Sequence, residues 1–278
     1  MKAIQRALVT VLSLAATAAF AADGIAFITN LKGDVAVDGN PRPALLSELA
    51  KGQKIAVGKE SQASVMYIHS GKEYLLKGPA DYFVKDTEIS STSGMPPVTR
   101  NTEWRTSNKV LVQVARSSAA SVRMRSVAPA KAAPSPVLLF PTQGSVATLQ
   151  PTFRWKAADA KAAAEFTLAV VGEDKPVVRA RAIGGSYQAA AKLEPGTEYY
   201  WVVASGGHEL GTGKFRTLPK EAIEAIEQRK PAEKADFTDR LMYALLLQEH
   251  GADQEAREAW ARLSQERADL PELAAMAK

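Results

Sequence analysis

The chain has 278 residues, of which 46% are hydrophobic and 23% are charged, and its formal net charge is +5 at neutral pH. This length and hydrophobic content accommodate two or more domains and exclude wholesale disorder. The lack of cysteine excludes disulfides, a thiolate nucleophile, cysteine-ligated metal centres and a lipid-modified cysteine anchor.

The first 21 residues have the pattern of a secretory signal peptide. Lys2 and Arg6 precede a run of small and apolar residues over 7–20, and the run ends in the A-x-A pattern Ala19-Phe20-Ala21. Fourteen helical residues would reach only about 21 Å, short of the ~30 Å hydrocarbon core, so an uncleaved anchor is the less favoured alternative. We therefore expect a periplasmic or secreted bacterial protein that starts at Ala22 and has no transmembrane segment.

The positive charge is concentrated in one part of the sequence. Residues 90–135 hold seven basic residues and one acidic residue, whereas residues 219–278 hold nine basic and thirteen acidic residues. No aromatic residues are interleaved with the basic ones to make a nucleic-acid groove. The sequence therefore predicts no nucleic-acid partner.

Residues 24–89 contain short segments in which apolar residues alternate with polar or small ones. Such segments are typical of half-buried strands, and their spacing of 8–12 residues indicates an all-β sandwich or a wound β module. The alternating pairs are Val35/Val37, Ile55/Val57, Val65/Tyr67, Tyr74/Leu76 and Tyr82/Val84.

The turn glycines and alternating apolar residues of this region resemble those of the FecR-type domain, a periplasmic sensor domain of bacteria. The residues that carry the resemblance are Gly33-x-Val35, Leu49-x-x-Gly52-x-x-Ile55-x-Val57-Gly58, Ala63-x-Val65 and Gly71…Leu76-x-Gly78. A further match lies at Ala120-Ser121-Val122-Arg123, where Met124 occupies the position of the family's glycine. The resemblance implies an all-β domain over 22–127 that responds to a ligand or a protein.

A linker separates this region from the next one. Val110 to Val114 form an apolar run that we interpret as a strand, and an Ala/Pro-rich stretch over 128–136 follows. We expect this stretch to be an extended domain boundary that keeps the cores on its two sides apart.

Residues 137–218 show a second all-β pattern with aromatic residues at alternate positions. The segment Leu193-x-Pro195-Gly196-Thr197-x-Tyr199-x-Trp201-x-Val203 resembles the tyrosine corner of fibronectin type III and immunoglobulin-like sandwiches. The resemblance implies that the Tyr199 hydroxyl bonds to upstream backbone. We expect Trp155 and Trp201 to fill the core from two sheets and Phe215 to lie on the last strand.

Residues 219–278 change to a helical period. Pro219 marks a first helix, Asp236 or Thr238 caps a second that stops at Gly251, and Ala256, Trp260 and Leu263 define a third. Leu247, Gly251, Ala256 and Trp260 have the spacing of a tetratricopeptide-type hairpin. Because a single repeat rarely stands alone, we expect this tail to dock on the preceding sandwich or on a partner. Glu255 and Glu258 beside Arg257 and Arg262 indicate a solvated helical face.

The sequence contains no constellation that predicts catalysis. Its three histidines, His69, His208 and His250, fall in different regions without metal-ligand spacing. No nucleophile elbow, P-loop or dinucleotide fingerprint occurs in a usable context. We therefore expect neither a cofactor nor a metal site.

The leading hypothesis is a mainly β, non-catalytic protein of the cell envelope that acts as a binding or scaffold protein, or as a sensing accessory. Its partner would be an envelope protein. The alternatives are a module that binds peptidoglycan or another carbohydrate, a glycan-active enzyme and a structural assembly subunit. Carbohydrate binding would require exposed aromatic side chains, for which the candidates are Tyr67, Tyr74, Tyr82 and Trp104. The sequence does not identify the ligand or the oligomeric state.

Overall fold

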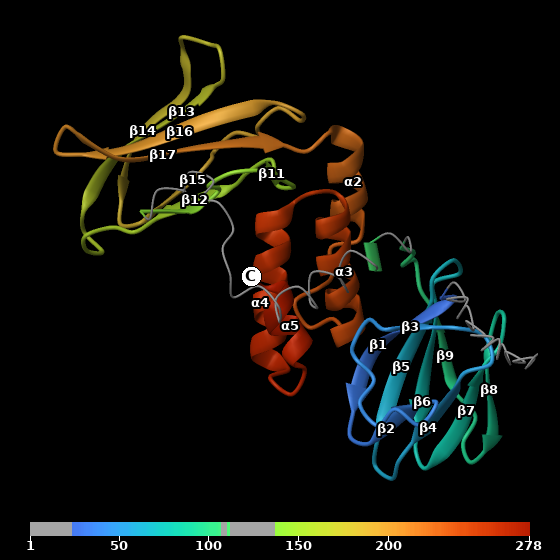
Figure 1. The fold of residues 1–278 in the computed structure, drawn as a ribbon. Coiled ribbons are helices and arrows are strands. Elements are labelled where there is room, and N and C mark those ends of the chain that lie inside the picture. The colour runs from blue at the N-terminus through green and yellow to red at the C-terminus, as the bar shows by residue number, and fades with distance from the viewer. Residues whose placement is uncertain (1–23, 107–109, 112–136) are drawn as a thin grey trace, which may run out of the picture.

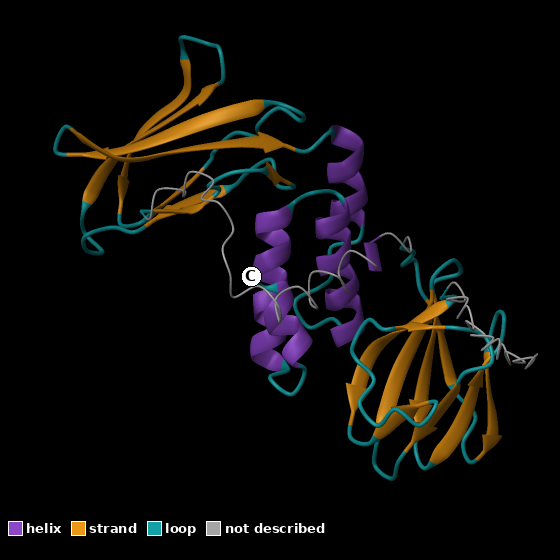
Figure 2. Cartoon of the chain, viewed as in Figure 1, coloured by secondary structure: helices purple, strands orange, loops and turns teal. Residues whose placement is uncertain are grey.

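The computed structural model describes residues 24–106, 110–111 and 137–278. The predicted signal peptide, the match at 120–123 and the predicted linker over 128–136 lie outside these residues. The described chain is mainly β, with several antiparallel sheets followed by a few short C-terminal helices. Two β units lie on opposite sides of the helices (Figures 1 and 2).

The N-terminal β unit contains two sheets, with strand orders β3-β1-β5-β6-β9 and β2-β4-β7-β8. A core of buried apolar side chains from both sheets fills the space between them. The strands of the first sheet are β1 (Ala26–Lys32), β3 (Glu48–Leu49), β5 (Gln62–Tyr67), β6 (Lys72–Lys77) and β9 (Val98–Asn101). Those of the second are β2 (Val35–Val37), β4 (Lys54–Val57), β7 (Ala80–Val84) and β8 (Ile89–Ser93).

The alternating pairs of the sequence account for most of this core. All five pairs lie on the strands β2, β4, β5, β6 and β7, and all ten side chains are buried, which confirms the predicted strands. Strand β1 has no such alternation because Phe27 and Thr29 face the helices while Ala26 and Ile28 face the sandwich core. A strand that is covered on both faces gives no period of two.

The second β unit also contains two sheets around one core. The strand orders are β10-β12-β15 and β11-β17-β16-β13-β14, and β11 is the strand that pairs in parallel with its neighbour. The smaller sheet has β10 (Leu138–Phe140), β12 (Thr152–Trp155) and β15 (Ser186–Gln188). The larger has β11 (Ser145–Val146), β13 (Ala163–Val170), β14 (Pro176–Ile183), β16 (Glu198–Ser205) and β17 (His208–Thr217).

The C-terminal residues form four helices, where the sequence predicted three. They are α2 (Lys220–Gln228), α3 (Phe237–Glu249), α4 (Asp253–Glu266) and α5 (Pro271–Met276). Pro219 and Asp236 precede α2 and α3, and Gly251 follows α3 with a φ of 78°, the left-handed conformation that glycine adopts most readily. No helix of the described residues is long and apolar enough to cross a membrane.

The predicted strand at Val110 to Val114 is wrong at the two residues that the structure describes. Val110 and Leu111 are helical, and both pack into the hydrophobic cluster of the C-terminal helices. A short apolar run fits a buried helical turn as well as a strand, so periodicity alone does not separate the two.

Candidate functional site

The helices α2–α5 share one hydrophobic cluster with parts of both β units. Phe27 and Met66 of the N-terminal unit and Ala147 and Leu218 of the second unit pack with buried residues of α2–α5. The helical tail therefore docks on both units, where the sequence predicted one sandwich or a partner. The sequence predicted that the two β units have separate cores. The interiors of the two sandwiches are indeed separate, but both units also contribute side chains to the hydrophobic cluster of the helices.

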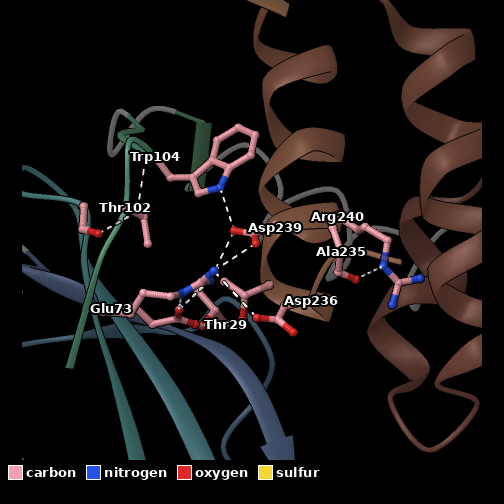
Figure 3. Close-up of polar contacts among 11 residues, drawn as sticks. Thr29, Glu73, Thr102, Trp104, Ala235, Asp236, Asp239 and Arg240 are labelled. Atoms are coloured by element: carbon pink, nitrogen blue, oxygen red, sulfur yellow. Dashed lines mark hydrogen bonds and ion pairs between the residues drawn. The ribbon is translucent and has the colours of Figure 1, made fainter. Parts of the chain in front are cut away.

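A polar cluster centred on Arg100 joins α3 to the first sheet of the N-terminal unit (Figure 3). Arg100 makes two bonds to Asp239, Nη1–Oδ2 at 2.9 Å and Nη2–Oδ1 at 3.1 Å, and its Nε donates to Glu73 at 2.7 Å. These carboxylates raise the pKa of Arg100, with the hydrogen bonds to Asp239 as the largest cause. Thr29 lies between Glu73 and Thr238, at 3.5 Å from each. A guanidinium and two carboxylates thus satisfy one another at a partly buried contact.

Trp104 completes this cluster from the end of the N-terminal unit. Its indole Nε1 donates to Asp239 Oδ1 at 2.9 Å, and its backbone N–H bonds to the Thr102 hydroxyl, which in turn donates to the carbonyl of Gly71. Gly71 has a φ of +68°, and an added Cβ would lie 2.1 Å from the Trp104 carbonyl oxygen. Glycine at this turn therefore permits the approach that positions the indole.

Arg267, directly after α4, makes a second connection to the N-terminal unit. Its Nη1 donates to Asn30 Oδ1 at 2.6 Å, and its Nη2 donates to the Leu31 carbonyl of β1. The same guanidinium pairs with Asp269 and lies over the ring of Phe237, at 5.2 Å from the centroid. The N-terminal unit is thus held at α3 and at the end of α4.

The first turns of α4 hold the second β unit. Glu255 accepts the backbone N–H of Ala147 at 2.7 Å and that of Thr148 at 3.2 Å, immediately after β11. One turn further on, Glu258 pairs with Arg154 of β12. The predicted solvated face at Glu255 and Glu258 is therefore wrong, because this face of the helix contacts the second β unit.

Burial raises the pKa of Glu255 to about 7. The two backbone N–H donors and Lys230 act in the opposite direction, and Glu258 adds to the rise. A carboxyl that ionises near neutral pH is thus placed at a contact between two units.

The helices also carry an open groove, which we call the helical groove. It has a volume of about 440 Å³ and lies between the α2–α3 connection, α3 and α4. Its rim carries the cations Lys230, Arg240 and Arg262 and the single acid Glu233; the other lining residues are Pro231, Ala232, Tyr243, Ala259 and Leu263. Figure 3 shows the neighbours Asp239 and Arg240 pointing in opposite directions, Asp239 toward the β sheet and Arg240 toward the neighbouring helix.

The cations of the helical groove are not all neutralised by the protein itself. Arg240 pairs with Glu266 of α4 and donates to the Ala235 carbonyl. Lys230 and Arg262 are exposed, and neither makes an ion pair within 4 Å to another residue that the structure describes. The groove therefore presents two cations without an ion pair within 4 Å in the described part of the chain beside a paired one, and the charge of Lys230 also acts on Glu255.

The residues predicted to build the second core lie together. Trp155 of β12 and Trp201 of β16 come from different sheets, and their ring centroids are 6.3 Å apart. Tyr199 and Phe215 stack on neighbouring strands at 5.6 Å. The backbone N–H of Glu194 donates to the buried Tyr199 hydroxyl at 2.9 Å, five residues upstream. These side chains contribute packing, and none of them lines the helical groove.

Trp260 and the three histidines, which the sequence analysis also considered, are distributed over the two β units and the helices. Trp260 is buried in the helical cluster, and its Nε1 donates to Gln248 at 3.3 Å. His69 is exposed in a turn, His208 is exposed at the start of β17, and His250 directly follows α3. No group of three or more potential metal ligands occurs among the described residues.

The four aromatic candidates for sugar stacking are buried, so this part of the carbohydrate hypothesis is wrong. Tyr67, Tyr74 and Tyr82 lie in the N-terminal core, and their hydroxyls donate to backbone carbonyls. Trp104 faces α3. A ring enclosed by its own domain presents no face to a sugar.

Sequence reasoning missed the residues that join the units, above all Arg100, Glu73 and Asp239. Their contacts span up to 139 positions in sequence, so no local period marks them. The available signal was compositional: the acidic excess of residues 219–278 follows the basic excess of residues 90–135, which contains Arg100. No family model matches this sequence, and no curated protein matches it.

Proposed function

We propose that this chain is a non-catalytic binding or scaffold protein of the bacterial cell envelope, which acts in the periplasm through protein–protein recognition. The observation that carries the proposal is the attachment of the helices to both β units. Arg100 and Asp239 join α3 to one unit, and Glu255 joins α4 to the other. The helices thereby hold the two units in one framework, and they also carry the helical groove.

The use of the charged side chains supports a scaffold. Arg100, Asp239 and Glu255 have partly buried side chains, and each is bonded to a group of another unit. Glu73 is buried and bonds Arg100 within the N-terminal unit. Buried charges that are satisfied in this way fix the relative position of the parts they join. The signal-peptide pattern and the FecR-type resemblance support an envelope location for this framework.

A crosslinking experiment in cells tests this proposal. The full-length gene product is exported in a bacterial host, crosslinked in the intact envelope and purified, and its adducts are identified by mass spectrometry. We expect a reproducible protein adduct whose yield falls in an Arg100→Gln/Asp239→Asn variant, because the framework is loosened at α3. A Lys51→Gln/Asp86→Asn variant is the matched control, since this ion pair is exposed and lies within one unit.

The same preparation separates protein recognition from wall binding. Isolated peptidoglycan is incubated with the mature protein and sedimented. Sedimentation with the wall polymer, without any reproducible protein adduct in cells, would overturn the proposal in favour of a wall-binding module.

A further inference from the structure

We propose that the helical groove binds an extended acidic segment of a protein partner, with Lys230 and Arg262 as the cations that recognise its carboxylates. This inference rests on the proposed function, since it supplies the chemistry of the partner. It starts from the charge balance of the helices. Residues 219–278 hold nine basic and thirteen acidic residues, so a cationic groove on them requires a physical reason.

The reason is that several acids of the helices are used at the two β units. Asp239 pairs with Arg100, Glu258 pairs with Arg154, and Glu255 accepts two backbone N–H groups. Asp236 also lies 3.7 Å from Arg100. These four acids therefore face the β units, and the groove lining itself holds three basic side chains and one acidic side chain, Glu233.

The basic side chains reach the groove from three separate elements. Lys230 lies in the connection between α2 and α3, Arg240 on α3 and Arg262 on α4. Arg240 is held by its ion pair with Glu266. Lys230 and Arg262 make no ion pair within 4 Å among the described residues. A carboxylate in the groove would gain charge-assisted hydrogen bonds from these two cations.

The remaining lining favours a peptide over a phosphate polymer. Pro231, Ala259 and Leu263 give the groove apolar surface, on which aliphatic side chains can pack. The Tyr243 hydroxyl makes no hydrogen bond to another described residue, and Glu233 adds an acceptor for a backbone N–H or a basic side chain. A volume of about 440 Å³ lies within the range of small ligand sites, roughly 300–1,000 Å³. An acidic peptide uses the cations, the acceptor and the apolar surface together.

Fluorescence anisotropy with defined peptides tests the inference on the full mature chain. The probes are fluorescein-labelled peptides of alternating glutamate and serine, and of alternating glutamine and serine. We expect the glutamate peptide to bind about tenfold or more tightly than the glutamine peptide, and to lose affinity as ionic strength rises from about 50 mM to about 300 mM.

Charge-neutralising variants locate the binding. Lys230→Gln/Arg262→Gln should weaken the glutamate peptide about tenfold, a loss of about 1.4 kcal/mol. Lys161→Gln/Lys175→Gln removes the same charge from exposed positions of the second β unit and should leave affinity unchanged. Thermal unfolding checks that both variants are folded. Equal effects of the two variants would show binding to net charge alone and would overturn the site.

Two further measurements test the type of ligand and the role of the groove in cells. Inorganic polyphosphate that binds at the groove more tightly than the glutamate peptide would replace the peptide by a phosphate polymer. If Lys230→Gln/Arg262→Gln abolishes the protein adduct in cells, the groove is the recognition surface. If the adduct persists unchanged, the groove assignment fails while the proposed function stands.

Discussion

Arg100 and Asp239 lie 139 positions apart in the sequence, and their side chains form a two-point ion pair between β9 and α3. The same Asp239 accepts the indole N–H of Trp104, and the same Arg100 bonds Glu73. Asp239 is therefore satisfied by two partners across the contact, and Arg100 by Asp239 across the contact and by Glu73 on its own sheet. This pattern makes the contact specific for one arrangement of the helix on the sheet.

A double-mutant cycle should measure a sizeable coupling between these two residues. Arg100→Gln, Asp239→Asn and the double variant are compared by urea denaturation of the mature chain. We expect a coupling of about 1–2 kcal/mol, because the pair is bidentate and partly shielded from water. The exposed pair Lys51–Asp86 should give only a few tenths of a kcal/mol. Similar coupling at the two pairs would contradict the role of Arg100 in holding α3.

Substitution of Tyr199 should separate the hydroxyl contribution from the packing contribution. Tyr199→Phe leaves the Glu194 N–H without its partner and should lower the free energy of unfolding by about 1 kcal/mol. Tyr199→Ala also removes the buried ring that stacks on Phe215 and should cost about 3–5 kcal/mol. Chemical denaturation measures both values. A change below about 0.5 kcal/mol in Tyr199→Phe, as at a surface position, would speak against the tyrosine-corner interpretation.

Much of the fold could be predicted because local periods report which side chains are buried. Ile55 and Val57 alternate with polar or small residues on a strand, and Ala256, Trp260 and Leu263 repeat at helical spacing. Both patterns follow from a single covered face. Strand β1 and the run at Val110 lack this signature, because β1 is covered on both sides and the run is too short to show a period.

The helical groove and the contacts between units could not be predicted in the same way. The groove depends on how Glu255 and Glu258 turn toward the second β unit while Arg262, on the same helix, remains exposed. In the sequence, these residues form one mixed charged segment. The position of the β units decides which of these charged side chains form contacts between units and which remain exposed to solvent.

Loss of the Trp260 ring should destabilise the helices and the β1 contact together. Trp260→Ala removes a buried side chain from the cluster that also contains Phe27 and Met66, so we expect a loss of about 3–5 kcal/mol. Hydrogen exchange should show faster exchange in α3 and α4 and in β1. The control is Gln265→Ala, an exposed substitution on α4 that should have little effect. Faster exchange confined to α4 would show that the cluster does not couple the units.

The pKa of Glu255 makes stability depend on pH in a defined direction. The value is raised from 4.5 to about 7 in the folded protein, so the folded state binds this proton more tightly than the unfolded state does. The resulting stabilisation is fully present below about pH 4.5 and is lost as the pH rises through about 7. Lys230, Glu258 and Tyr243 are the ionisable groups around this carboxyl, and Ala147 and Thr148 face it with backbone N–H groups.

Glu255→Gln should remove this pH dependence while it keeps an oxygen acceptor for the backbone of the second β unit. Between about pH 5 and pH 8, the wild-type chain should lose up to about 3 kcal/mol of stability relative to the glutamine variant. Urea denaturation at several pH values measures the difference, and Glu249→Gln on the exposed end of α3 is the control for loss of one negative charge. If wild type and Glu255→Gln change in parallel across this range, Glu255 ionises at an ordinary pH and its contact with Ala147 does not sense neutral pH.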